Sequence, residues 1–140
     1  MRMLTRIAVA AVMGIAAGGA GAAAAELDYA VFKSRIEPIF LKHRTNHARC
    51  YTCHAESTNA FHLVRLTPGS DVWSEAQSRQ NFETVSRLVV SGDVAASRLL
   101  AHPLAPEAGG DSYHSGGRQF ASKQDPDWKA IAAWINGATK

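Results

Sequence analysis

The five residues CYTCH at positions 50–54 constrain this chain more than any other stretch, and they contain its only two cysteines. The two thiols stand three positions apart, and a histidine follows the second one directly. In this order Cys50 and Cys53 can each add to one of the two vinyl groups on a porphyrin edge, and His54 is then held beneath the ring, where it can bind iron. The motif therefore predicts covalent attachment of a c-type haem.

Other chemistry for the same cysteines fits less well. A disulfide between Cys50 and Cys53 would close a very short loop and constrain the unfolded chain little. A thioredoxin-like redox pair needs a β-α-β context, and no strong strand pattern surrounds the motif. A zinc site is the stronger competitor, because His43 and His47 precede the cysteines and would complete a set of four ligands. However, only two residues separate His47 from Cys50, and so short a link would strain a tetrahedral cage.

The beginning of the chain has the pattern of a secretory signal peptide. Two arginines precede a short apolar run, and three alanines ahead of Glu26 suit a cleavage site. We therefore predict a signal peptide over residues 1–25, one domain over residues 26–140, and export to the periplasm. An uncleaved signal anchor is the alternative, although the apolar core is short for a membrane span. We predict no membrane span in residues 26–140.

Removing the signal segment changes the charge of the chain. The segment holds two of the 15 basic residues and none of the 12 acidic ones, so 13 basic and 12 acidic side chains remain. No basic run with interleaved aromatic residues follows, and we therefore predict no nucleic-acid binding. Taking 25 residues from 140 leaves 115, which is the size of one ordinary domain. A haem in its middle would supply apolar surface to a core of this modest size.

Apolar residues recur at helical spacing in several segments. We predict helices over residues 29–41, 80–90 and 127–137, and a shorter helical turn over residues 95–100. Pro38 is expected to kink or end the first helix, because proline removes a hydrogen bond and crowds the preceding turn. Asn81 is a candidate cap for the second helix. The last helix contains two tryptophans, and we expect it to pack against the first helix.

Methionine is the usual partner of histidine in electron-transfer cytochromes of this size. All three methionines lie within residues 1–13, inside the predicted signal peptide. The remaining chain therefore offers no methionine to the iron, whose second axial position is filled by another histidine, by a different group, or by no protein group.

The segment 102–117 contains four glycines and two prolines, which predicts an irregular loop far enough along the chain to return across a haem. Of its two histidines we favour His114 as the sixth ligand, because the glycine pair that follows it allows close backbone approach. His102 is the second choice, since Pro103 restricts the backbone there. His62, or no protein ligand, also stays open.

Several of these segments resemble known sequences. The IEPIF run at 36–40, the CYTCH motif and the WKAIAAWI segment at 128–135 resemble bacterial single-haem c-type cytochromes. The SRLL run at 97–100, followed by HPL and HSGG, resembles the planctomycete-type cytochrome c module, found in multidomain proteins and in free-standing relatives. The resemblance covers nearly all of residues 26–140.

The resemblance implies an all-α, small cytochrome c-like helical domain packed around one covalently attached haem c. It implies that Cys50 and Cys53 carry the thioether bonds, that His54 binds the iron, and that haem is attached after export. The family usually supplies methionine on the other face of the iron, and this chain departs from that pattern.

The favoured function is a periplasmic single-haem electron carrier, ligated by His54 and His114, that exchanges electrons with a redox partner protein of unknown identity. Such a protein is not an enzyme, and bis-histidine ligation would give it a lower potential than histidine–methionine ligation. The alternative is a haem-based sensor that binds a gas or peroxide at an open or displaceable distal site. A peroxidase-like activity is a third possibility, and it would need a positioned distal acid or base.

Overall fold

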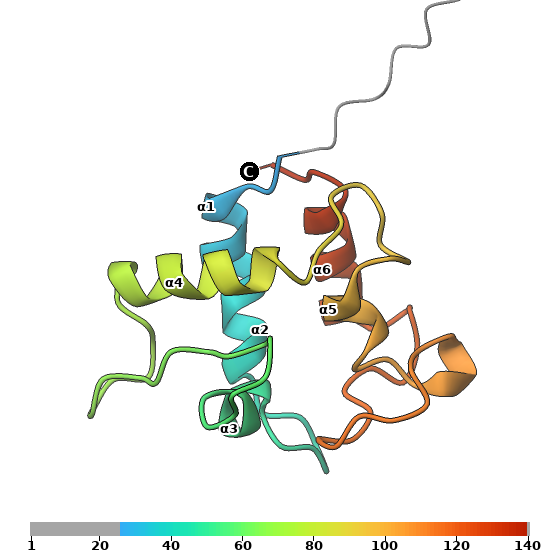
Figure 1. The fold of residues 1–140 in the computed structure, drawn as a ribbon, viewed down its shortest axis with the longest axis horizontal. Helices are drawn as coiled ribbons and strands as arrows, with labels where there is room; N and C mark the ends of the chain where they lie inside the picture. The colour runs from blue at the N-terminus through green and yellow to red at the C-terminus, as the bar shows by residue number, and fades with distance from the viewer. Residues whose placement is uncertain (1–25, 140) are drawn as a thin grey trace, which may run out of the picture.

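The computed structural model describes residues 26–139, and the predicted signal peptide lies outside them. Helices are the regular elements of this part of the chain (Figure 1), which forms isolated β-bridges but no β-strand. The prediction of a helical domain is confirmed to this extent. The elements are α1 (Tyr29–Val31), the π-helix η1 (Phe32–Ile36), α2 (Glu37–Leu41), α3 (Cys50–His54), α4 (Glu75–Ser86), α5 (Arg98–Ala101), the 3₁₀-helix η2 (Pro106–Ala108) and α6 (Pro126–Ile135).

The first three elements form one uninterrupted helical segment, as predicted for residues 29–41. Asp28 caps it by accepting a hydrogen bond from the backbone N–H of Val31 at 2.8 Å. The segment does not end at Pro38. Instead, the turn before the proline widens, and the N–H of Glu37 donates to the carbonyl of Phe32 five residues earlier. A π-helical turn of this kind relieves the crowding that a proline ring causes in an α-helix, so the helix continues to Leu41.

The prediction for the second helix was wrong at both ends. Helix α4 begins five residues earlier than expected, where the Ser74 side chain accepts from the backbone N–H of Gln77 and the Gln77 side chain accepts from the backbone N–H of Ser74. This capping box fixes the start of the helix. Asn81 is not a cap, because it lies fully buried in the middle of the helix. The helix ends at Ser86 rather than at residue 90.

The C-terminal half agrees better with the sequence. Helix α5 overlaps the predicted turn over residues 95–100, and α6 overlaps the helix predicted over residues 127–137. Asp125 caps α6, accepting from the backbone N–H groups of Asp127 and Trp128. The loop between α5 and α6 is irregular as expected, except for the single turn of η2.

The core lies where α6 crosses the first helical segment. The ring of Trp134 lies 5.6 Å from that of Phe32, centre to centre, and Phe82 of α4 packs against both rings. The indole N–H of Trp134 donates to the carbonyl of Asp28 at 2.9 Å. The predicted packing of the last helix against the first is therefore confirmed.

A buried polar group ties α2, α4 and the loop between α3 and α4 together. The carboxylate of Glu37 accepts from the Ser78 hydroxyl at 2.8 Å and from the Asn81 amide at 3.3 Å, and all three side chains are buried. The other end of the Asn81 side chain accepts from the backbone N–H of Val64 at 2.8 Å. Because buried polar groups need partners, this network fixes the position of the loop that follows the CYTCH motif.

Nothing in residues 26–139 forms a helix that is both long enough and apolar enough to cross a bilayer.

Candidate functional site

The CYTCH motif forms the short helix α3, which begins at Cys50 and ends at His54. Residues three apart on a helix lie on one face, so both thiols point to the same side. Cys50 is half-buried, Cys53 is exposed, and both are free thiols, so the disulfide considered from the sequence is not formed. Burial raises the pKa of the Cys50 thiol to about 11. At neutral pH this thiol stays protonated, which disfavours a redox nucleophile at this position.

His54 is held in a state suited to binding a metal. Its Nδ1 lies 2.7 Å from the carbonyl oxygen of Phe61, and the two rings are in contact, with centres 4.3 Å apart. A carbonyl can only accept, so the proton is on Nδ1 and Nε2 carries the lone pair. Burial lowers the pKa of His54 despite the opposing effect of the Phe61 carbonyl. The ring is therefore a neutral imidazole, the form that binds iron.

A cavity of about 380 Å³ adjoins α3. It brings together segments that are far apart in the sequence, and it lies within the size range of ordinary cofactor pockets. Apolar side chains make up much of its wall. The side chains that line it include Arg49, Cys50, Cys53, His54, Ser57, Phe61, Arg98, His102, His114 and Gln119.

His114 lies in this cavity close to His54. The two imidazole ring centres are 6.3 Å apart, and the ring planes are inclined by 27°. Transition metals bind imidazole nitrogen at about 2 Å. Because that nitrogen lies about 1 Å from the ring centre, two imidazoles on opposite sides of one metal have centres about 6 Å apart. The separation of His54 and His114 thus fits a pair of axial ligands.

The two glycines after His114 explain the position of its ring. A side chain at Gly116 would place its Cβ 3.2 Å from Cε1 of His114, so glycine leaves room for the imidazole. Gly117 has a φ of +79°, and this turn brings its carbonyl to within 2.6 Å of the His114 Nδ1. His114 therefore also carries its proton on Nδ1 and presents a free Nε2.

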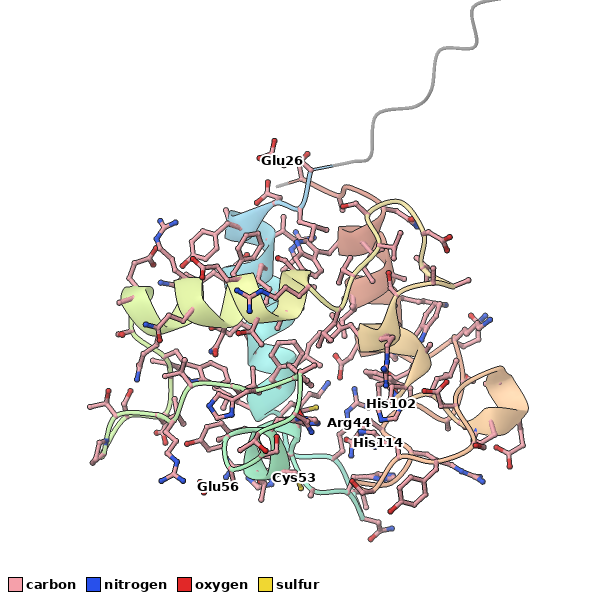
Figure 2. All side chains as sticks on the ribbon, viewed as in Figure 1. Glu26, Arg44, Cys53, Glu56, His102 and His114 are labelled. Carbon is pink, nitrogen blue, oxygen red and sulfur yellow. The ribbon has the colours of Figure 1, made fainter. Side chains whose placement is uncertain are left out.

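His102 lines the same cavity, and its ring centre lies 5.0 Å from that of His114. Its Nδ1 is 2.6 Å from the carboxylate of Asp111. Figure 2 shows His102 and His114 near each other on the part of the molecule that carries Cys53. The structure thus brings both predicted candidates from the loop to the cavity, and the ring centre of His114 lies 6.3 Å from that of His54.

The remaining histidines do not join the site. His62 is exposed, hydrogen-bonds the Ser57 carbonyl and does not line the cavity. His43 and His47 are exposed. Within residues 26–139, no group of three or more His, Cys, Asp or Glu side chains is arranged to hold a metal ion. The zinc cage considered from the sequence is therefore not formed, whereas haem iron needs only two axial ligands from the protein.

Two polar atoms of the cavity wall have no partner among the described residues. The Ser57 hydroxyl and the Gln119 side-chain oxygen are both buried and form no hydrogen bond there. The other end of the Gln119 amide donates to the Gly116 carbonyl at 3.1 Å, which braces the loop of His114. Buried polar groups without partners are costly, so the cavity fits a ligand that is largely apolar and carries polar groups.

Sequence reasoning missed Ser57, Gln119 and the two arginines of this wall. None of them belongs to a recognisable motif by itself. Arg98 belongs to the SRLL run, which resembles the planctomycete-type cytochrome c module, and this resemblance was the one signal that could have pointed to it.

Comparison of the chain with family models, with curated protein sequences and with solved structures gives no match. The function is therefore argued from the cavity and its side chains.

Proposed function

We propose that this chain is a periplasmic c-type cytochrome that binds one haem covalently and carries electrons. The observation that supports it most is the pairing of His54 and His114 at 6.3 Å in a cavity that also contains both cysteines. In this proposal Cys50 and Cys53 hold the porphyrin through thioether bonds. His54 and His114 would be the two protein ligands of its iron. The bound group would supply an iron that gains and loses one electron.

Both histidines are arranged to keep their positions when the charge of the site changes. Each has its Nδ1 proton held by a backbone carbonyl, from Phe61 and from Gly117. These hydrogen bonds orient the rings and increase the basicity of the free nitrogen. A ligand pair that does not rearrange favours electron transfer over substrate binding.

The apolar part of the wall also suits this role. Phe40, Leu99 and Ile131 are buried and line the cavity, so these side chains would shield part of the bound group from water. With histidine in place of methionine, the reduction potential is expected to lie below that of histidine–methionine cytochromes.

The test is expression of the full chain in a bacterium that matures c-type cytochromes, followed by mass spectrometry and visible spectroscopy. We expect a covalent mass increase of one haem and low-spin spectra in both redox states. His114→Ala should become high-spin in at least one state, whereas the matched exposed variant His62→Ala should stay low-spin. A chain that acquires no haem, or a low-spin His114→Ala spectrum identical to the parent, would contradict the proposal.

A second candidate function is a haem-based sensor for a gas or peroxide. The contact between His102 and His114, with Asp111 behind His102, favours it, because a second imidazole could hydrogen-bond a small ligand that displaces His114. Rapid carbon monoxide binding to the reduced protein would support the sensor, and absence of binding would support the electron carrier.

A further inference from the structure

The wall of the cavity carries positive charge without any negative charge. Of the side chains that line it, Arg49 and Arg98 are cationic, and none is an aspartate or a glutamate. A cavity with this charge is complementary to a ligand that bears anionic groups.

Neither arginine is neutralised elsewhere in the described part of the chain. Arg44, Arg65, Arg79 and Arg118 each pair with a carboxylate, but Arg49 and Arg98 form no ion pair within residues 26–139. Arg49 lies over the ring of Tyr51, with 5.8 Å between its guanidinium carbon and the ring centre. Arg98 has no such contact, so its guanidinium is available to a ligand.

The backbone at Arg98 is well fixed. Its neighbours Ser97, Leu99 and Leu100 are buried. The Ser97 hydroxyl accepts from the N–H of Val90 at 2.9 Å and donates to the carbonyl of Asp93 at 2.7 Å. Arg98 itself is exposed and lines the cavity, so its side chain extends from a fixed backbone position.

Resting on the proposed function, we infer that Arg98 binds the carboxylate groups of the haem. The vinyl groups that react with the cysteines and the carboxylates lie on opposite edges of the porphyrin. Arg49 directly precedes Cys50 and so belongs to the attachment edge. Arg98 belongs to α5, which lies away from α3 and beside α6 (Figure 1) while lining the same cavity. The planar guanidinium can donate two parallel hydrogen bonds to a carboxylate.

The charge of Arg98 would also affect the reduction potential of the iron. A positive charge that pairs with the carboxylates offsets their negative charge, which otherwise stabilises the oxidised iron. Arg98 should therefore raise the reduction potential and keep the carboxylates ionised across the neutral pH range.

The test compares purified holoproteins carrying Arg98→Gln, Arg49→Gln or Arg35→Gln with the parent by redox titration between pH 5 and 8. Arg35 is the matched control, because it is exposed, forms no ion pair within residues 26–139 and does not line the cavity. We expect Arg98→Gln to lower the potential and to make it depend on pH, since a carboxylate without its partner takes up a proton more readily. Arg35→Gln should change neither property.

The outcomes separate this inference from the proposed function. If Arg98→Gln behaves like Arg35→Gln, or if only Arg49→Gln shifts the potential, the assignment of Arg98 is overturned although the protein is a cytochrome. If the parent chain carries no covalent haem, the proposed function fails and the inference fails with it.

Discussion

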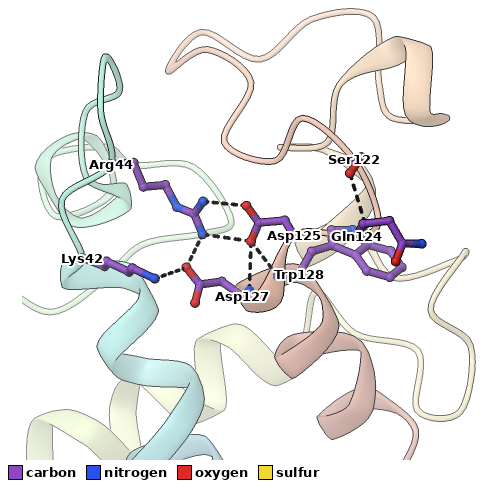
Figure 3. Close-up of polar contacts among 7 residues, drawn as sticks. All are labelled: Lys42, Arg44, Ser122, Gln124, Asp125, Asp127 and Trp128. Carbon is purple, nitrogen blue, oxygen red and sulfur yellow. Dashed lines mark hydrogen bonds and ion pairs between the residues drawn. The ribbon is translucent and has the colours of Figure 1, made fainter.

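Asp125 links the start of α6 to the segment between α2 and α3 (Figure 3), and its replacement tests how the walls of the cavity are held together. Its carboxylate accepts from the backbone N–H groups of Asp127 at 2.9 Å and Trp128 at 3.3 Å, and it pairs with Arg44 at 3.0 Å. Arg44 also pairs with Asp127, and its guanidinium lies 4.9 Å from the ring centre of Phe120.

The cost of removing this side chain can be divided into two parts. Loss of a helix N-cap costs about 1 kcal/mol. Loss of a partly buried hydrogen bond between charged groups costs about 1.5 kcal/mol at the lower end of its range, and the lower end applies because Asp127 still pairs with Arg44. Asp125→Ala should therefore lower the unfolding free energy by about 2.5 kcal/mol. Asparagine is as good a cap as aspartate, so Asp125→Asn should lose about 1.5 kcal/mol.

Urea unfolding of the parent protein and the two variants, followed by far-UV circular dichroism at pH 7, measures both values. Equal losses for the alanine and asparagine variants would refute the capping argument. Losses below about 0.5 kcal/mol for both variants, which is the range of ordinary surface substitutions, would refute the link to Arg44 as well.

The same pair of proteins gives a pH test. Burial alone would raise the pKa of Asp125, but the hydrogen bonds from Arg44 and the helix amides outweigh it and hold the pKa below its usual 3.8. A carboxyl with a lowered pKa stabilises the fold above pH 3.8, and this contribution is lost as the pH falls through the lowered value. The stability difference between the parent and Asp125→Asn should therefore shrink in acid.

Three further predictions follow from contacts outside the cavity. Burial raises the pKa of Glu37 although its hydrogen bonds lower it. The contribution of Glu37 to stability is therefore greatest below its usual pKa of 4.5 and is lost as the pH rises through the raised value. In urea titrations, Glu37→Gln should gain stability relative to the parent between pH 4 and 7. Gly110→Ala should destabilise strongly, because its Cβ would lie 2.0 Å from the Leu104 carbonyl oxygen. Thermal unfolding should show a larger loss than for Gly69→Ala, where the φ of +82° strains the alanine backbone but the Cβ meets no other atom. Ser74→Ala should cost about 1 kcal/mol by removing the capping box of α4.

Much of the helical architecture could be predicted because apolar spacing and caps are local properties. The first and last helices show a clear apolar stripe, and Asp28 and Asp125, which are common N-cap residues, cap them. The start of α4 could not be found in the same way. Its first turns are polar, so apolar spacing begins only near Phe82, and the capping box at Ser74 was the local signal that was overlooked.

The failures share a physical cause. Asn81 has the chemistry of a cap, but its burial depends on Glu37, which is far away in the sequence and brought near only by packing of α2 on α4. Pro38 was expected to disturb the helix, and the sequence could not show that a wider turn upstream would absorb it. For the cavity, the motif and the glycine pair pointed to His54 and His114, and both line it, whereas the contribution of Gln119 depends on tertiary burial.

The loop that carries His114 is closed at its base. The N–H groups of Gln119 and Phe120 both donate to the carbonyl of Pro103, and Leu104 bridges to Phe120. Its two ends are therefore fixed to each other independently of the residues between them. Under the proposed function, helix α3 would supply one ligand of the iron and this loop would supply the other. Loops of different length that carry a different ligand could then be placed between these two anchor points. The reduction potential would change from one such protein to the next while the helices stay the same.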